Sequence, residues 1–456
     1  MMTPNTHSAP GRRIDGSAGP RRGATGAARP SIRTSGPSWR VRPAAVLALA
    51  FVAVTGCDRV DDLLSVETPS RLAENTLLIP ANADLLVKSA VGDFQCAYGG
   101  YVVASGLGAG ELTETSQTAS RWSYDRRDVR PTDAHYSTFG CTDIGVYTPI
   151  STARYTNDQI LQKLEEWTDE EVPGRQELIA TAATFAGYSY LLLGEGFCTA
   201  TVNGGAELTS EQLFDSAEVR FTRAIEVAQT TGDAAILNLA YVGRARARLY
   251  GGDPTGAAAD AQAVPVGFVY TLESTDVASR YYNRVAAQNI TGNVVSVAPA
   301  YQNPTVQGVA DPRVQAVDAG TKAGDGETEL WRQKKYPDIT TPMPLATGVE
   351  AQLILAEALG GAEGATILNN LRARAGVNLP PLTAAERANL QQTIFDERSR
   401  ELWLQGTRWY DLRRGNLPLV PATGSPYLKG GTYGDQRCWP LPDVERLANP
   451  NIPDQG

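Results

Sequence analysis

The sequence predicts a mainly α-helical protein in which short antiparallel helical hairpins are followed by long irregular loops. Between residues 175 and 264, apolar residues recur at the three-to-four-residue spacing of helices, with only short turn segments between the periodic stretches. Between residues 265 and 345 this period is lost, and Tyr, Asn, Pro and Gly become frequent. A chain of 456 residues with 42% hydrophobic and 20% charged residues has the composition of a globular protein with a sizeable core.

The N-terminal 56 residues predict an export signal. Eleven apolar residues, 44–54, follow Arg40 and Arg42, and this stretch is too short to cross a bilayer. It leads into a Val-Thr-Gly-Cys sequence that ends at Cys57 and resembles the lipobox of bacterial lipoproteins. We therefore expect cleavage before Cys57 and acyl chains on Cys57 that form a stable membrane anchor. An ordinary signal peptide or a short buried helix is the alternative interpretation.

The segments around this signal differ in character. Residues 1–39 are rich in Gly, Ser, Pro and Arg without periodicity, so we expect a disordered prefix. We also hypothesise that translation starts at a non-ATG codon at Val41. Residues 57–75 are expected to form a lipid-anchored linker, and residues 76–456 a single domain.

Loss of the signal region makes the chain strongly acidic. Residues 1–56 hold eight Arg and one acidic residue, Asp15, so their removal changes the formal net charge from −9 to −16. Such a charge repels a polyanionic backbone, and we therefore expect no nucleic-acid partner.

The other four cysteines predict disulfides. Cys96, Cys141, Cys198 and Cys438 are an even number in an exported chain, where thiols oxidise. They allow three pairings, of which we favour Cys96–Cys141 together with Cys198–Cys438. Four reduced, buried cysteines are the alternative, whereas a zinc site is disfavoured because no C-x-x-C spacing occurs.

The first part of the domain has a mixed pattern. Residues 82–91 can form a helix, whereas the Gly-rich stretch 106–111 and the polar stretch 122–133 are predicted to be loops. An amphipathic helical pattern begins again at 150–167.

The most regular region is a predicted helical-repeat platform at about 150–264. Asp253 and Pro254 supply a cap and a first helical residue, a strong signal for a helix start. Small residues at the helix crossings and short connections are typical of tetratricopeptide-type hairpins, with a plain α-bundle as the alternative. The four helices expected after residue 175 cover 177–193, 210–230, 234–249 and 255–264.

A variable loop region at about 265–345 separates this platform from a C-terminal part at about 349–456. Thr383 and Glu386 form a capping box that begins the last long helix. The tail after residue 416 should be irregular. The helices expected in the C-terminal part cover 349–359, 362–375 and 383–406.

Charged residues are concentrated near the end of that last helix. Glu397 and Glu401 are four residues apart and share one helix face. A glycosidase needs two carboxylates that flank a sugar from opposed positions, so this pair does not favour catalysis. We instead predict a structural charge network that fixes the helix to the segment after Gly406. Its members are Glu397, Arg398, Glu401, Arg408, Asp411 and Arg413.

No catalytic or metal site is predicted. After removal of the signal region the chain has one histidine, His135, and no G-x-S-x-G elbow accompanies it. Neither an H-E-x-x-H nor a G-x-x-x-x-G-K-[ST] motif occurs, and GLGAGE at 106–111 lacks the third glycine of a dinucleotide fingerprint. We therefore expect neither enzyme activity nor a cofactor.

Five separated motifs resemble the SusD/RagB family of outer-membrane nutrient-binding lipoproteins, and their order and spacing match as well. Family members usually have Glu before the Gly of an E-x-x-x-E-G run, where this chain has Gln405, at a position that looks structural. The motifs are DPRV at 311–314, AQLILAEAL at 351–359, LNNLRARAGV at 368–377, ERSRELWLQGTRWYDLRR at 397–414 and WPLPDVERLANPNI at 439–452.

This resemblance implies an α-rich fold with tetratricopeptide-like helix pairs. It also implies a lipid-anchored protein of the outer membrane that faces the exterior, lies on a SusC-like TonB-dependent β-barrel transporter and delivers oligosaccharides or peptides to it. Family members are not enzymes, and their ligand contacts vary, so no ligand residue is carried over. The alternative is a tetratricopeptide-type scaffold lipoprotein of an envelope complex that binds no small molecule.

Aromatic residues are the best candidates for ligand contacts, because a flat ring stacks on the apolar face of a sugar. Trp403, Trp409 and Trp439 lie within the family motifs, and we expect them in the core. Ordinary packing is the alternative for every other candidate. The candidates are Tyr98, Tyr101, Trp122, Tyr124, Tyr281, Tyr282 and Trp331.

Overall fold

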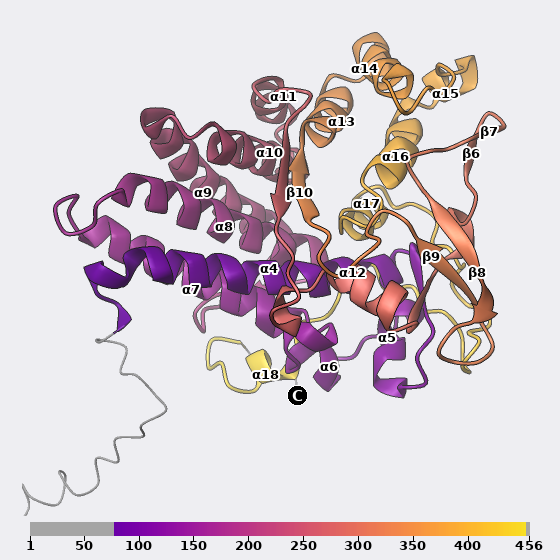
Figure 1. Cartoon of the computed structure of the whole chain (residues 1–456), viewed down its shortest axis with the longest axis horizontal. Helices are drawn as coiled ribbons and strands as arrows, with labels where there is room; N and C mark the ends of the chain where they lie inside the picture. Colours follow the sequence, from indigo (N-terminus) through magenta and orange to yellow (C-terminus); the bar gives the residue numbers. More distant parts are fainter. Residues whose placement is uncertain (1–76, 453–456) are drawn as a thin grey trace, which may run out of the picture. The chain divides into compact units, whose positions relative to one another are not determined.

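Helices dominate residues 77–452, the part of the chain that the computed structural model describes (Figure 1). The long helices gather on one side, and the short strands and irregular segments gather on the other. The predicted mainly α fold is confirmed. The predicted signal region 1–56, the lipidation site Cys57 and the linker 57–75 lie outside the described residues.

Helices joined by short segments make up the first half of this unit. From α7 to α11 each helix packs against the next one in the sequence, and α4 packs against both α7 and α8. The four helices that periodicity predicts after residue 175 are all present. The helices are α4 (Ala83–Gly108), α5 (Trp122–Arg126), α6 (Ala134–Ser137), α7 (Tyr147–Glu166), α8 (Arg175–Gly196), α9 (Ser210–Thr231), α10 (Ala234–Gly251) and α11 (Pro254–Gln262).

Side-chain caps define where the helices of this block begin. Thr209 and Gln212 form a capping box at the start of α9. The Asp233 side chain accepts hydrogen bonds from the first turn of α10. Asp253 caps α11 by accepting from the Gly256 N–H, and Pro254 follows at the first helical position, as predicted.

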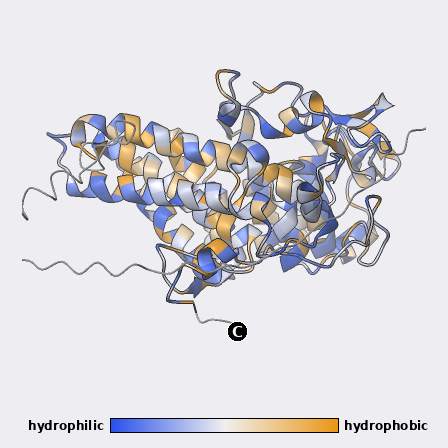
Figure 2. Cartoon of the chain, turned by 90° about the horizontal axis from the view of Figure 1, so that it is seen from below, coloured by the Kyte–Doolittle hydropathy of each residue, from blue (hydrophilic) through white to orange (hydrophobic). Residues whose placement is uncertain are grey.

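Close packing between α8, α9 and α10 depends on glycines that face Phe221. A Cβ atom at Gly187 or Gly243 would lie 2.7 or 2.4 Å from Cε1 of Phe221, closer than carbon atoms approach. The Phe221 ring is fully buried and makes an edge-on contact with Tyr188, with 5.0 Å between ring centroids. Hydrophobic and hydrophilic residues are interspersed along the long helices in Figure 2. The buried residues of α9 recur at a spacing of three to four, as expected where one face is buried.

Short antiparallel strand pairs occur in the region predicted as loops and in two segments before it. The pairs are β1 with β5, β2 with β3, β4 with β10, β6 with β7, and β8 with β9. Strands of two to seven residues are too short to leave a clear alternating pattern in the sequence, which explains why they were missed. The strands are β1 (Leu112–Glu114), β2 (Ala200–Thr201), β3 (Glu207–Leu208), β4 (Val269–Leu272), β5 (Val295–Val297), β6 (Thr305–Val306), β7 (Val309–Ala310), β8 (Ala316–Lys322), β9 (Glu329–Gln333) and β10 (Met343–Thr347), with helix α12 (Arg284–Ala286) between β4 and β5.

Helices return in the C-terminal part. The capping box of Thr383 and Glu386 is present, but it begins a short helix. Asn389 has φ −115° and ψ 48°, outside the helical region, and divides the predicted long helix in two. The helices are α13 (Gly348–Leu359), α14 (Gly361–Ala373), α15 (Ala384–Ala388), α16 (Leu390–Glu401), α17 (Arg408–Arg414) and α18 (Asp443–Arg446).

Two loop predictions in the first part of the domain, 106–111 and 122–133, hold for residues 109–111 and 127–133 and are wrong for the residues before them. Helix α4 continues through the Gly-rich stretch to Gly108, because residues 96–110 are buried on every side and leave no amphipathic period to detect. The polar stretch 122–133 begins with α5, which ends at Arg127 in the left-handed conformation, φ 57°.

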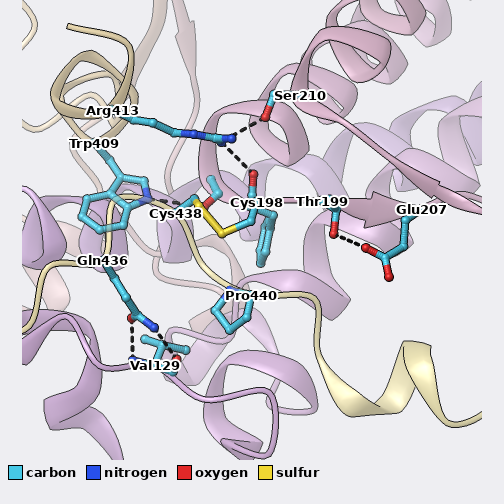
Figure 3. The surroundings of a disulfide bond; sticks show 12 residues. Val129, Cys198, Thr199, Glu207, Ser210, Trp409, Arg413, Gln436, Cys438 and Pro440 are labelled. Atoms are coloured by element: carbon cyan, nitrogen blue, oxygen red, sulfur yellow. Dashed lines mark hydrogen bonds between the residues drawn. A yellow bond between two sulfur atoms is a disulfide. The ribbon is translucent and has the colours of Figure 1, made fainter. Parts of the chain in front are cut away.

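Two disulfides join distant parts of the chain with the pairing that we favoured. Cys96 of α4 is bonded to Cys141, and their Cα atoms are 5.5 Å apart. Cys198, just after α8, is bonded to Cys438 of the C-terminal tail (Figure 3), with a Cα separation of 5.0 Å. The tail is irregular, as predicted, and this bond holds it against the helical block.

Side chains of α17 reinforce the second disulfide (Figure 3). Trp409 donates its indole N–H to the Gly196 carbonyl oxygen at 3.3 Å. Arg413 donates to the Phe197 carbonyl oxygen and to the Ser210 hydroxyl, each at 3.0 Å. The end of α8, the start of α9 and the tail therefore meet at one point.

Buried ion pairs link the C-terminal helices. Arg398 donates to Asp411 at 2.8 Å, and both side chains are buried. Asp411 also binds Arg414 at 2.7 Å. Arg398 makes a further bond to the Tyr250 hydroxyl at 2.9 Å, so the network reaches α10.

The rest of the charge network uses cations that the sequence analysis did not assign. Glu397 binds Arg313 and Arg372, and Glu401 binds Arg313 and Arg374. Two predicted members, Arg408 and Arg413, donate to carbonyl oxygens instead of carboxylates. The missing partners lie 25 to 88 residues away in the chain, a separation that local spacing does not reveal.

Candidate ligand-binding site

A pocket of about 510 Å³ lies where several short elements meet beside the helical block. Strands β1, β5 and β9, helix α5 and the segment 420–433 supply its walls. Its lining combines aromatic rings, small apolar side chains and a few polar groups, the composition typical of a small-molecule site. The lining residues are Gly110, Leu112, Thr113, Asp125, Ser296–Ala300, Gln302, Thr328, Glu329, Trp331, Val420, Pro421, Leu428 and Tyr433.

Backbone hydrogen bonds hold Trp331 in the pocket wall. The Trp331 N–H donates to the Ser296 hydroxyl at 2.8 Å, and that hydroxyl donates to the Glu329 carbonyl oxygen at 2.8 Å. The Asn289 amide donates to the Trp331 carbonyl oxygen at 3.0 Å. The indole is partly exposed, and its N–H has no hydrogen-bond partner within residues 77–452. It therefore offers both a flat face and a free donor.

Asp125 of α5 supplies the buried acidic group of the site. Its Oδ2 accepts from the Glu114 N–H at 2.9 Å and from the Tyr427 hydroxyl at 3.5 Å. Burial raises the pKa of Asp125 to about 7, although Lys429 and Arg127 oppose this shift. Its Oδ1 accepts no hydrogen bond from the described residues, so it is available to a ligand hydroxyl.

Tyr433 forms part of the wall that the C-terminal tail contributes. Its ring contacts Tyr427 edge-on, with 5.1 Å between the centroids, and the Arg127 guanidinium lies 4.9 Å from its centroid. Arg127 in turn donates to the Gly434 carbonyl oxygen at 3.1 Å. These contacts fix the ring, so the Tyr433 side chain loses little conformational entropy when a ligand stacks on it.

The structure corrects three of the seven aromatic ligand candidates. Tyr98 is buried and donates to the Pro344 and Gln405 carbonyl oxygens. Tyr101 and Tyr124 are fully buried and pack edge-on against Trp439. They belong to the aromatic core, because α4 and α5 lie inside the fold, and a ligand in solvent has no access to them.

Of the other four candidates, only Trp331 lines the pocket. Trp122 is partly buried, and its indole N–H donates to the Ser116 carbonyl oxygen at 3.0 Å. Tyr281 packs under the Arg280 guanidinium, 5.3 Å from its centroid, and neither Tyr281 nor Tyr282 lines the pocket. Trp403, Trp409 and Trp439 are buried, as expected.

Sequence reasoning missed Asp125 and Tyr433. They lie 308 residues apart, and the fold brings them to one pocket through the contact of Arg127 with Gly434 and that of Tyr427 with Asp125. Asp125 lies in the polar stretch 122–133, next to Trp122 and Tyr124, but its sequence context marks it as an ordinary loop carboxylate. No local pattern distinguishes it.

Within residues 77–452 there is no group of three or more His, Cys, Asp or Glu side chains that could hold a metal ion. The same residues contain no helix with the length and apolar character needed to cross a membrane.

Relatives with the same architecture have been solved. A SusD-like carbohydrate binding protein from Bacteroides vulgatus superimposes with a TM-score of 0.62 at 17% identity, covering 82% of this chain and 97% of its own. A laminarin binding SusD-like protein gives a TM-score of 0.56 at 16% identity, covering 82% and 98%. At these identities the likeness establishes the fold alone.

Sequence comparisons also find similarity to SusD-like proteins. SusD-like protein P2 of Formosa agariphila is 28% identical over 324 residues, 64% of this chain, and the match spans only 62% of that relative's length. A profile of the SusD family matches residues 280–436, which include Trp331, Tyr433 and four of the five motifs. The family-model match, this relative and the solved structures together support the SusD/RagB family for this chain.

Proposed function

We propose that this protein is a binding protein that captures oligosaccharides in the pocket of Asp125, Trp331 and Tyr433. The observation that carries this proposal is the partly exposed Trp331 indole, with its unbonded N–H, on the wall of a pocket of about 510 Å³. Stacking on Trp331 and Tyr433 and hydrogen bonds to Asp125 Oδ1 are the two interactions that sugar recognition needs. The carbohydrate-binding and laminarin-binding descriptions of two solved relatives support this ligand class.

The binding test is isothermal titration with laminarin-derived oligosaccharides, alongside other neutral oligosaccharides and short peptides. Trp331→Ala should weaken sugar binding about tenfold or more, since it removes the main stacking surface. Tyr155→Ala is the matched control, because this exposed tyrosine on α7 lies outside the pocket. Equal loss in both variants, or an unchanged Trp331→Ala variant, would contradict the assignment of the site.

The proposal includes anchoring at Cys57 in the outer membrane and delivery of the ligand to a TonB-dependent transporter. Affinity purification of C-terminally tagged protein from solubilised outer membranes should recover a barrel in stoichiometric amount. Cys57→Ala should release the protein from the membrane fraction. A protein that binds none of the sugars or peptides and purifies with a different envelope complex would support the scaffold alternative.

A further inference from the structure

A second pocket, of about 550 Å³, lies apart from the first and shares none of its lining residues. It is formed by the segment before β4, the end of β9, the start of α13 and the turn after α14. One wall is apolar and includes the ring of Phe268. The apolar residues of this wall are Val266, Phe268, Val269, Val349 and Val377.

A second set of lining residues is cationic. It contains Arg313, Lys334, Lys335 and Arg374, with Glu401 as its single carboxylate. The charges of the two arginines are already matched: Arg313 binds Asp311, Glu397 and Glu401, and Arg374 binds both oxygens of Glu401 at 2.6 Å. The two lysines form no ion pair within the described part of the chain. The pocket therefore has two positive charges that no carboxylate of the described residues contacts directly.

Lys335 is the more unusual of the two lysines. It is partly buried, and its ammonium group makes a single hydrogen bond, to the Trp403 carbonyl oxygen, although an ammonium group has three protons to donate. The Tyr336 ring, 5.6 Å from the nitrogen, is its other near neighbour. Burial lowers the pKa of Lys335 to about 8, despite the opposing field of Glu111 and Glu401. A desolvated cation with spare donors is stabilised by an anion that enters the pocket.

Lys334 lies beside it at the solvent side of the pocket. Its side chain is exposed, and its backbone N–H donates to the Gln315 carbonyl oxygen at 2.9 Å, which fixes the base of the side chain. Lys334 also lines the adjoining hollow of about 380 Å³ that shares Pro312 and Gln315 with this pocket. It is placed to meet the charged part of a ligand as the ligand enters.

We infer that this second pocket binds a carboxylate-bearing saccharide, with Lys335 and Lys334 holding the carboxylate and Phe268 contacting the apolar face of the sugar ring. The site is argued from its own lining, whereas the choice of a saccharide rests on the proposed function. The formal charge of the chain without residues 1–56 is −16, so the positive charges of this pocket are opposite in sign to the net charge of the protein. Repulsion from distant acidic residues is screened at physiological salt, and the local cations determine which ligand binds.

The test is isothermal titration of the full chain with tetragalacturonate and with its fully methyl-esterified form. The acid should bind about tenfold or more tightly than the ester, because the ester removes the charge that the lysines recognise. Lys335→Met should abolish this preference, and Lys334→Met should reduce it severalfold. Lys88→Met is the matched control, since Lys88 is an exposed lysine of α4 that pairs with Asp84 outside both pockets. Equal affinity for acid and ester would overturn the inference.

Two further measurements test whether the charge of Lys335 causes the preference and whether the acid binds in the second pocket. The preference for the acid should fall as pH rises from about 7 to 9, since Lys335 then loses its charge. If Lys335→Met fails to fold, this pH profile and the exposed variant Lys334→Glu decide the question. A preference that is unchanged in both experiments overturns the inference.

Trp331→Ala should leave the binding of tetragalacturonate unchanged. If this variant loses tetragalacturonate binding, the acid binds in the first pocket and the inference is overturned.

Neutral laminarin oligosaccharides keep the two proposals distinguishable. If they bind and tetragalacturonate does not, the further inference fails and the proposed function stands. If acetylated penta-alanine binds in a Lys335-dependent manner while the uronate does not, the carboxylate comes from a peptide and the saccharide assignment is overturned.

Discussion

The helical block α7–α11 and the region from β4 to the tail differ in how far apart in the sequence their contacting residues lie. The helical block relies on contacts between neighbouring helices, both apolar, such as Phe221 against Gly187 and Gly243, and ionic, such as Arg244 with Asp260. The later region relies on ion pairs between distant residues, such as Arg313 with Glu397, and the bond between Cys198 and Cys438 ties its tail to the helical block. Apolar packing tolerates little change in size, and a buried ion pair tolerates little change in charge. Both pockets draw most of their lining from the second region.

Removal of one buried charge should give the largest effect. Asp411→Asn leaves the fully buried Arg398 without its counter-ion, and we expect the free energy of unfolding to drop by about 3–5 kcal/mol. Urea denaturation measures this loss. Glu226→Gln is the control from the helical block, because its exposed pair with Arg223 at 3.8 Å should contribute less than about 0.5 kcal/mol. Similar losses in the two variants would show that burial does not determine the cost of a lost ion pair.

The two disulfides should differ in their contribution to stability. Cys198 and Cys438 are 240 residues apart, against 45 for Cys96 and Cys141. Loop-closure entropy predicts that Cys198→Ser with Cys438→Ser costs about 1.5 kcal/mol more than the other double replacement. Thermal or urea unfolding of both double variants tests this ranking. A reversed order would mean that structure remaining in the unfolded chain outweighs loop length.

Added volume in the helical block should have a smaller effect than a removed charge. Gly243→Ala forces a methyl group against Phe221 and should cost about 1–3 kcal/mol. Gly251→Ala in the same helix is the control, because a Cβ there meets no atom within 4 Å, and it should be neutral or slightly stabilising. The double variant Gly243→Ala with Phe221→Leu should be less unstable than the sum of the single changes. Additive losses would show that the two side chains do not compete for the same space.

The same difference between the regions explains which elements could be predicted from the sequence and which could not. Helices α8 to α11 follow from periodicity and, for α11, from the cap at Asp253, which are local signals. The division of the last long helix at Asn389 and the continuation of α4 to Gly108 were missed, because burial and long-range packing determine them. Of the candidate site, only Trp331 was anticipated. Asp125 and Tyr433 become neighbours through contacts between residues about 300 positions apart, which no spacing rule encodes.

A further expected effect is a change in the pH dependence of stability. Burial raises the folded-state pKa of Asp125 to about 7, whereas in the unfolded chain the carboxyl loses its proton near pH 4. Between these values the folded state binds one more proton, so this group makes stability fall with rising pH by up to about 1.4 kcal/mol per unit. Asp125→Asn should remove this contribution. The buried Glu111 and Glu195, whose pKa values burial also raises to about 7, remain in both proteins and cancel in the comparison. Parallel stability curves for the two proteins between pH 4 and 7 would contradict the assignment.

The bond between Cys198 and Cys438 has a consequence for survival in an environment rich in proteases. It closes a covalent ring that includes α9 to α17 and most of the residues that line both pockets. A single peptide cut anywhere between residues 199 and 437 opens this ring but leaves the two pieces joined. A nick in an exposed segment such as the one around Val277, whose side chain is 84% exposed, would therefore not detach the C-terminal half from the rest of the chain.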